Sequence, residues 1–442
     1  SGEKAGADLI LIETMGDLYE IKSAVLAAKE NTGLPVFVSM IFDKKGKLLT
    51  GGDVRTAVVM LEGLGVDGIG LNCGFGPDIM QKYVDEAVRC SSTPVFAQPN
   101  AGLPMSVNGK TVYNVSPEEF ARKQLDILKK GACALGGCCG TTPEHIKAMV
   151  DLCKNEEIIP VTPKNITAVS SYGKTVEFSE KPVIIGERIN PTGKKMLKEA
   201  LRHKDIEYIC NEGANQSDCG ADILDVNVGL PEINEAEMMV NSVNALQSIL
   251  DLPLQIDTSD AGVMEKALRI YNGKAMINSV NGKKESMDSI FPLVRKYGGV
   301  VVCLTLDENG IPNSSEGRIK IAEKIIRTAE SYGISKNDLI FDPLCMSIST
   351  DKNNAGITLE CVEKLTAKGV KTVLGVSNIS FGLPNRDLIN STFFALALQK
   401  GLSAGIINPK SEMMMNTLLS FNALSGLDDN FENYISKTTD AH

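Results

Sequence analysis

The segment Val183-Ile184-Ile185-Gly186-Glu187-Arg188-Ile189-Asn190 opens the part of the chain that decides its fold. It begins with an apolar run, as a strand buried on both faces of a parallel sheet requires, and polar residues follow. The same arrangement returns along the chain, with amphipathic stretches of about ten to twenty residues in between. The apolar runs are residues 183–189, 223–228, 254–258, 275–280, 300–306, 339–344, 372–377 and 404–407. Eight such units predict an α/β fold, a closed TIM (β/α)8-type barrel over residues 182–442.

Polar side chains stand at the C-terminal ends of these runs. They are Glu187, Asn190, Asp225, Asn227, Asp257, Asn278, Asp342, Asn378 and Asn408. Any one of them can serve as an Asx turn or a helix cap instead. Recurrence at seven run ends favours one shared site, because TIM barrels place their active sites at this end. Carboxylates and carboxamides can pair with both edges of a planar ring, so a pterin-like heterocycle is the expected ligand.

The first part of the chain repeats this pattern but stops short of a full barrel. Residues 8–14, 35–41, 68–73, 94–98 and 132–137 predict five strands with helices between them. We expect residues 1–159 to form the first of two tandem TIM barrels, lacking about three N-terminal βα units. Such an open sheet exposes two unpaired edges unless another chain supplies the rest. Residues 160–181, interrupted by prolines, serines and Gly173, predict an interdomain linker.

Three cysteines fall at two of these predicted strand ends. Cys73 lies in Asn72-Cys73-Gly74, and Cys138 and Cys139 lie in Gly136-Gly137-Cys138-Cys139-Gly140. Adjacent cysteines are poor disulfide partners for each other, whereas three converging thiolates suit zinc and leave its fourth position open. A buried, inert thiol is the alternative for any single cysteine. The Cys-Cys pair between glycines favours the metal, so these three residues are the predicted zinc ligands.

Composition excludes several classes of protein. The 442 residues, 43% hydrophobic and 23% charged, predict two or three domains of an ordinary soluble enzyme. The sequence contains no run of eighteen apolar residues, so it predicts no membrane span. The net charge of −10, without a basic stripe, argues against nucleic acid as a partner. Eleven cysteines without framework spacing predict free thiols and a cytoplasmic location.

The motifs resemble those of the cobalamin-dependent methionine synthases. The first part is similar to their homocysteine-binding zinc domain through residues 12–14, 72–74, 98–102 and 136–143. The second part is similar to their folate domain through residues 186–193, 225–227, 256–259, 277–279, 341–344 and 375–378. Betaine-dependent homocysteine methyltransferases resemble the first part alone, and corrinoid methyltransferases of acetogens or dihydropteroate synthases the second alone. The tandem order selects the methionine synthase family.

The resemblance implies roles for individual residues. Cys73, Cys138 and Cys139 would hold zinc, whose open position takes the sulfur of homocysteine, and Glu13 would contact the amino group of homocysteine unless it caps the next helix. The expected contacts to the pterin of methyltetrahydrofolate come from Asp257, Asn278 and Asp342, with Glu187, Asn190, Asp225 and Asn227 lining the same mouth. Asn378, assisted by Asp257, is the expected catalytic group, stabilising a proton delivered through water to the methyl-bearing nitrogen.

The implied reaction moves the methyl group of 5-methyltetrahydrofolate to cob(I)alamin, and then from methylcobalamin to zinc-bound homocysteine. Its products are methionine and tetrahydrofolate, and the cobalamin-binding domain or corrinoid protein is expected outside this chain. Two alternatives stay open. One is a folate-dependent corrinoid-protein methyltransferase that uses only the second barrel, and the other is a noncatalytic folate-binding protein. Zinc binding and methyl transfer to free cob(I)alamin distinguish them.

Overall fold

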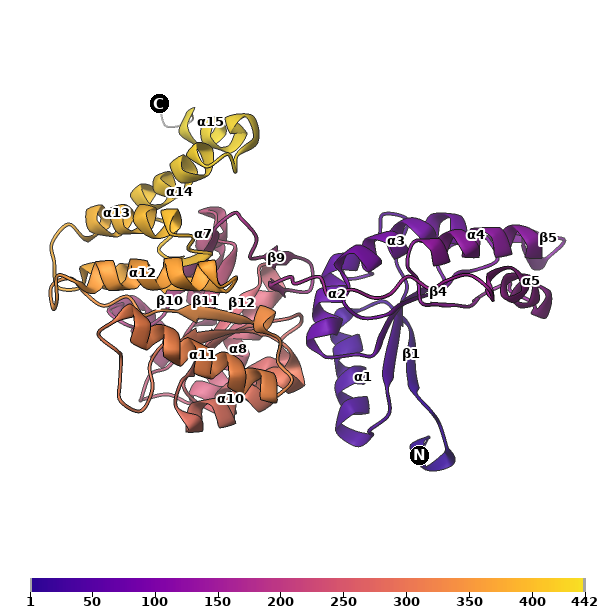
Figure 1. Cartoon of the computed structure of the whole chain (residues 1–442), viewed down its shortest axis with the longest axis horizontal. Helices are drawn as coiled ribbons and strands as arrows, with labels where there is room; N and C mark the ends of the chain where they lie inside the picture. Colours follow the sequence, from indigo (N-terminus) through magenta and orange to yellow (C-terminus); the bar gives the residue numbers. More distant parts are fainter. Residues whose placement is uncertain (1, 440–442) are drawn as a thin grey trace. The chain divides into compact units, whose positions relative to one another are not determined.

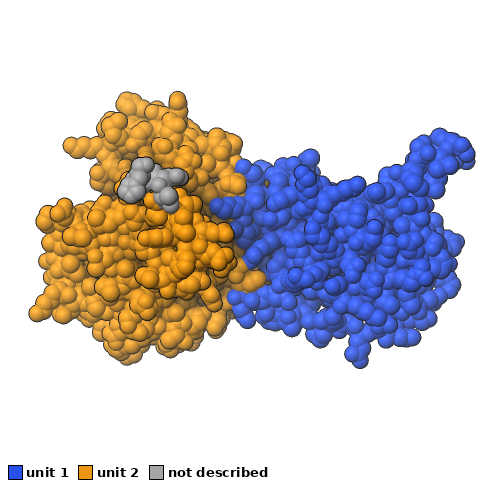
Figure 2. Space-filling model, turned by 90° about the horizontal axis from the view of Figure 1, so that it is seen from above, with its two compact units in different colours: residues 1–165, 172–175 blue, residues 166–171, 176–442 orange. Residues whose placement is uncertain are grey.

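The computed structural model describes residues 2–439 and forms two compact units, which Figure 2 colours separately. One unit contains residues 1–165 and 172–175, and the other contains residues 166–171 and 176–442. The extreme ends of our predicted ranges, residues 1 and 440–442, lie outside the described residues. Within residues 2–439, no helix is long and apolar enough to cross a membrane.

A five-stranded parallel sheet, in the order β1-β2-β3-β4-β7, forms the centre of the first unit. The strands are β1 Ile10–Met15, β2 Val36–Met40, β3 Gly68–Asn72, β4 Val95–Gln98 and β7 Ala134–Leu135. The helices are η1 Glu3–Ala5, α1 Leu18–Asn31, α2 Val54–Gly63, α3 Pro77–Cys90, α4 Pro117–Lys129 and α5 Pro143–Cys153. The five predicted strands are confirmed, and β1 and β7 are the two edges of the sheet.

A β-hairpin interrupts the alternation of strand and helix between β4 and α4. Strands β5 Pro104–Val107 and β6 Lys110–Tyr113 pair antiparallel around Asn108 and Gly109, which both have positive φ angles. We did not predict this hairpin, although Asn-Gly is a strong signal for a two-residue hairpin turn. Tyr113 packs against Gly140, where a Cβ atom would lie 2.2 Å from the Tyr113 Cγ. The hairpin therefore ends beside the cysteine loop.

The second unit is a closed barrel of eight parallel strands, β10 to β17. The strands are β10 Val183–Ile189, β11 Ile223–Val226, β12 Leu254–Asp257, β13 Met276–Asn281, β14 Val300–Leu304, β15 Leu339–Asp342, β16 Lys371–Gly375 and β17 Ala404–Ile407. The α-helices are α6 Lys195–Arg202, α7 Ile206–Asp218, α8 Glu235–Ile249, α9 Ala261–Ile270, α10 Lys284–Tyr297, α11 Ser315–Ser331, α12 Asn354–Ala367, α13 Arg386–Gln399, α14 Glu412–Leu424 and α15 Glu432–Thr439. Short 3-10 helices are η2 Lys336–Asp338, η3 Val376–Ser380 and η4 Asp429–Phe431. Figure 1 shows α10, α11 and α12 on the outside of the strands, and the predicted barrel is confirmed.

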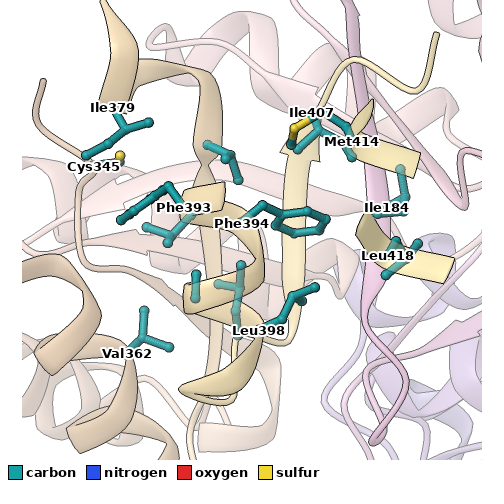
Figure 3. Close-up of a cluster of buried hydrophobic side chains, with 14 residues drawn as sticks. Ile184, Cys345, Val362, Ile379, Phe393, Phe394, Leu398, Ile407, Met414 and Leu418 are labelled. Atoms are coloured by element: carbon teal, nitrogen blue, oxygen red, sulfur yellow. The ribbon is translucent and has the colours of Figure 1, made fainter. Parts of the chain in front are cut away.

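Helices α13 and α14 pack on the last barrel strands through one apolar cluster. Phe394 lies within this cluster, with Ile184, Met414 and Leu418 around it (Figure 3). Gly405 on β17 allows the close approach of the ring, because a Cβ there would lie 2.8 Å from the Phe394 Cε2. Burial of these side chains stabilises the closure of the barrel by roughly 1.5–3 kcal/mol for each large residue.

The chain segment that leads into β10 fills the end of the barrel where the strands begin. Strands β8 Ala168–Ser170 and β9 Thr175–Glu177 form a two-stranded sheet. Val169, Val176 and Phe178 share one apolar cluster with interior residues of the barrel strands. Ser170 also accepts hydrogen bonds from the Tyr271 hydroxyl to its carbonyl (2.9 Å) and from the Lys274 N–H to its side chain (3.1 Å). Much of the segment expected as a linker at 160–181 is therefore folded structure.

Candidate functional sites

The three predicted zinc ligands lie together at the C-terminal edge of the first sheet. Cys73 follows β3 and has a φ of 59°, and Cys138 and Cys139 follow β7. The N–H of Cys73 donates to the Gln98 carbonyl (3.1 Å), and the N–H of Cys138 donates to the Pro99 carbonyl (2.9 Å). All three sulfurs lie within 4.8 Å of one another. Backbone hydrogen bonds thus fix the loops that bring the thiols together.

The sulfur spacing fits a tetrahedral zinc ion. Zinc–sulfur bonds of about 2.3 Å place two sulfurs about 3.8 Å apart. The Cys73 and Cys139 sulfurs are 3.8 Å apart. Burial first, and then the charge of Cys73, raise the pKa of Cys138 to about 11. A divalent cation among the sulfurs would reverse this tendency, because it favours the thiolate form of each ligand.

Two asparagines and a tyrosine surround the thiols. The Asn72 Nδ2 donates to the Thr14 Oγ1 (2.6 Å) and lies 3.8 Å from the Cys138 Sγ. The Asn100 Oδ1 accepts from the N–H of Cys139 (3.0 Å). The Tyr113 ring packs against Gly140, next to Cys139, and burial, followed by the neighbouring Cys139, raises the pKa of its phenol. We did not single out these three residues, although Asn72 and Asn100 belong to the quoted motifs.

Glu13 lies on the edge strand β1, directly before Thr14, and its side chain is exposed. The N–H of Thr14 donates to the Asn72 Oδ1 (3.2 Å), so the end of β1 is tied to the cysteine loops. Asp17 caps helix α1, because its side chain accepts from the N–H of Glu20. The alternative role of Glu13 as a helix cap is therefore wrong.

A cavity of about 640 Å³ opens at the C-terminal ends of the barrel strands. Its size suits a ligand as large as a pterin with an attached ring. The predicted residues that line it are Glu187, Asn190, Asp225, Asp257, Asn278, Asp342, Asn378 and Asn408. Asn227 is not among the lining residues. It lies behind Asp257, and its Nδ2 donates to the Asp257 Oδ2 (2.9 Å). Further lining residues that we did not predict include Arg188, Lys194, Ser377, Phe381 and Asn390.

Asp225 and Asp257 form a pair of acids in the cavity wall. Asp225 is buried and accepts from the Gln255 Nε2 (2.6 Å). Burial, and then the charge of Asp257, hold the pKa of Asp225 well above its usual range. Burial also raises the pKa of Asp257 to about 6, against the hydrogen bond from Asn227. Two such acids can hold a proton near neutral pH and release it to a bound ligand.

Glu187 lies near the Lys194 cation, which follows the same strand, and near the Ser377 hydroxyl, which comes from another strand end. Burial raises its pKa, and the hydrogen bond from the Ser377 hydroxyl (3.1 Å) opposes this effect. The Lys194 ammonium donates to the carbonyls of Glu187 (3.0 Å) and Asn190 (3.1 Å), and burial lowers its pKa. We did not predict Lys194, because two adjacent lysines such as Lys194 and Lys195 are typical of a solvent-exposed surface.

Asn278 and Asn378 present free carboxamides to the cavity. Asn278 lies on β13, and Asn378 lies on η3, directly after β16. Among the described residues, neither side chain makes a hydrogen bond to another protein group. Since each carboxamide offers both donors and an acceptor, these two are available to bind a ligand.

Replacement of Asp342 with asparagine is expected to stabilise the protein at alkaline pH. Burial raises the pKa of Asp342 from 3.8 to about 7. The folded state therefore binds more protons between about pH 4 and 7, and stability falls as pH rises through this window. Asp342→Asn removes that loss. The free energy of unfolding of the variant should therefore exceed that of the native protein by a few kcal/mol at pH 8 and by less at pH 5. Urea unfolding at both pH values measures this difference.

The exposed substitution Glu285→Gln serves as the control for the Asp342 experiment, and it should change stability little at either pH. An equal effect of Asp342→Asn at pH 5 and pH 8 would contradict the raised pKa of this carboxyl.

Family models match both parts of the chain. The model of the homocysteine S-methyltransferases matches residues 2–153, and the model of the pterin binding enzymes matches residues 186–408. The methionine synthase of Mycobacterium leprae (strain TN) is 32% identical over 451 residues, covering 96% of this chain and 37% of that protein. The methionine synthase of Mycobacterium tuberculosis (strain ATCC 25618 / H37Rv) is 31% identical over 439 residues, covering 93% and 36%. The expected resemblance is confirmed, and the chain spans little more than a third of these relatives.

Solved structures similar to this chain include dihydropteroate synthases. The enzyme from Xanthomonas albilineans in complex with 7,8-dihydropteroate is 21% identical, with a TM-score of 0.47, and covers 59% of this chain and 98% of that chain. The enzyme from Yersinia pestis is 17% identical, with a TM-score of 0.44, and covers 59% and 99%.

Proposed function

Because this chain belongs to the pterin-binding enzyme family and carries a homocysteine S-methyltransferase domain before its pterin-binding domain, we propose that it transfers the methyl group of methyltetrahydrofolate towards homocysteine. One observation supports this function above others. A cluster of three thiols and an acid-lined barrel cavity occur in a single chain, so a site for a thiol acceptor and a site for a pterin donor accompany each other.

The barrel cavity would bind and activate the methyl donor. Asp257, Asn278 and Asp342 would pair with the donors and acceptors of the pterin ring, as their place in the wall allows. During transfer, the bond between N5 and the methyl carbon breaks, and its electron pair stays on N5. A proton must then reach N5, and the pair Asp225 and Asp257, with raised pKa values, can supply it through water. Asn378 would stabilise that proton at the ring nitrogen.

The cysteine site would bind the methyl acceptor. Cys73, Cys138 and Cys139 would hold zinc, which favours the thiolate of a fourth sulfur ligand at neutral pH. Asn72 and Asn100 would keep the cysteine loops in place, since their side chains contact Cys138 and Cys139. Glu13, exposed at the same edge of the sheet, would pair with the amino group of homocysteine. The homocysteine sulfur would release its proton to solvent and form the new bond to the methyl carbon, while the bond between that carbon and its carrier breaks and its electron pair stays on the carrier.

A corrinoid would carry the methyl group between the two sites. We place it on a cobalamin-binding domain or a separate corrinoid protein, and we place the whole reaction in the cytoplasm, where thiols stay reduced.

The first test uses the protein of residues 1–442. Metal content after purification, homocysteine binding, folate binding and single-turnover methyl transfer from methyltetrahydrofolate to free cob(I)alamin are measured on the same sample. About one zinc per chain, together with methyl transfer, would support the proposed function. Absence of zinc in a protein that still transfers the methyl group would confine the function to the second barrel. Folate binding without transfer would indicate a noncatalytic binding protein.

A further inference from the structure

Arg318 is a buried cation that our account of the pterin cavity does not use. It lies in the first turn of α11 and is 1% exposed. Its Nε donates to the Pro312 carbonyl (3.0 Å), and its Nη1 donates to the carbonyls of Pro343 (2.7 Å) and Leu344 (2.9 Å). Within residues 2–439, no carboxylate forms an ion pair with it. A buried charge held only by neutral acceptors is costly, which favours a function for it.

One peptide group joins Arg318 to Asp342. The carbonyl of Pro343 accepts from Arg318, and the N–H of the same peptide, which belongs to Leu344, donates to the Asp342 Oδ1 (2.7 Å). The guanidinium and the carboxylate therefore sit at opposite ends of one peptide dipole, and each hydrogen bond strengthens the other. Asp342 lines the cavity, whereas Arg318 does not. Arg318 thus acts on the cavity only through this peptide.

The loop that follows Asp342 is held in its conformation by hydrogen bonds from outside the barrel. Leu344 has a φ of 66°, a conformation that residues other than glycine rarely adopt. The Leu344 carbonyl accepts both from Arg318 and from the Thr358 hydroxyl (3.2 Å) on α12. Two helices outside the barrel thus hold the backbone that presents Asp342 to the cavity.

We propose that Arg318 is a positioning residue of the pterin site, which fixes and polarises the Asp342 carboxylate through the Pro343–Leu344 peptide. The inference rests on the proposed function, since it assigns Asp342 to the pterin ring. A pterin donates N–H groups to this carboxylate, so the ionised form of Asp342 binds the ring. Arg318 favours that ionised form, because its charge lowers the pKa of Asp342 against the opposing effect of burial.

Other charged groups face Asp342 without the same connection. Cys345 follows it in the loop, and the remaining acids and bases of the cavity approach from other strand ends. The acids are Glu187 on β10, Asp225 on β11, Asp257 on β12 and Asp387 on α13, and the cations are Arg188, Lys194 and Arg386. Among the charged groups in the described residues, Arg318 is the one that shifts the pKa of Asp342.

The test compares Arg318→Met with the native protein of residues 1–442. Binding of methyltetrahydrofolate is measured by calorimetry from about pH 5.5 to 9, and circular dichroism checks folding. Loss of the guanidinium should raise the pH midpoint of binding by about one unit. At pH 7 this weakens affinity about fivefold, because the ionised fraction of Asp342 falls from about one half to about one tenth. Thr358→Val removes a neighbouring contact of the same loop without changing charge. It should leave the midpoint in place even if affinity falls.

The pH dependence of folate binding in the Arg318 variants decides whether Arg318 positions Asp342. Equal weakening by Arg318→Met at every pH would overturn the inference, because it would indicate support of the fold alone. If Arg318→Met does not fold, Arg318→Lys replaces it. Lysine keeps the charge but cannot bridge the same carbonyls, so a smaller upward shift is expected and an unchanged midpoint overturns the inference. Absence of folate binding by the native protein would overturn the proposed function itself, and the inference with it.

Discussion

Replacement of Cys138 or Cys139 with serine is expected to remove zinc from the protein and to abolish homocysteine binding. Zinc binding to closed protein sites is worth about 10–16 kcal/mol, shared among the ligands. Loss of one thiolate of three should therefore weaken zinc binding on the order of a thousandfold, because a serine hydroxyl stays protonated at neutral pH. Metal content is measured by mass spectrometry after dialysis, and homocysteine binding is measured by calorimetry on the same samples.

Cys153→Ser provides the matched control for the cysteine variants. Cys153 lies at the end of α5 in the same unit, half-buried and outside the thiol cluster. This variant should keep about one zinc per chain. Full zinc content in Cys138→Ser would show that the metal binds elsewhere and would remove the basis for homocysteine activation at this site.

The second large effect is expected at Asn378. Its carboxamide faces the cavity without a protein partner among the described residues, so it is free to act on the ligand. If it stabilises the proton at N5 mainly in the transition state, Asn378→Ala should lower the rate of methyl transfer by about 10²–10³-fold. Folate affinity should change much less, since interactions made in the transition state alone affect rate more than binding. Single-turnover transfer to free cob(I)alamin at saturating methyltetrahydrofolate measures the rate.

Asn309→Ala, at an exposed asparagine outside this cavity, should leave the rate unchanged. If Asn378→Ala transfers the methyl group at the native rate, Asn378 is not catalytic. If its whole defect lies in folate affinity, Asn378 only binds the ring.

The barrel strands were predictable because they are buried on both faces. Strands β10 and β17 match the predicted runs from end to end, and apart from their glycines and the charged pair Glu187 and Arg188 their residues are apolar. The two-stranded sheet β8–β9 was not predictable in this way. Its strands have three residues each, too few to show a period, and the nearby prolines, serines and glycine are typical of a connector. Its apolar residues find their partners in strands far away in the sequence.

The site residues that lie at the ends of strands were predictable from the sequence. Acids and amides that end a strand reach the cavity directly, as Asp257 and Asp342 do. Ser377 was not predictable, because its role depends on a contact between separate strand ends. Lys194 binds carbonyls four and seven residues before it, and its place in a pair of adjacent lysines concealed this role. The Ser377 hydroxyl binds Glu187 across 190 positions of sequence, and no local pattern records such a pair. Asn227 also follows a strand end, but its side chain does not line the cavity. It donates a hydrogen bond to Asp257 instead.

The sheet β8–β9 has a kinetic consequence. Since it fills the barrel where the strands begin, the cavity described among residues 2–439 opens at the opposite end. Under the proposed function, the folate and the corrinoid that takes its methyl group would then use the same opening. The folate would have to enter first, and the spent pterin could leave only after the corrinoid has withdrawn. Steady-state kinetics should accordingly show a compulsory order, with the folate first in and last out.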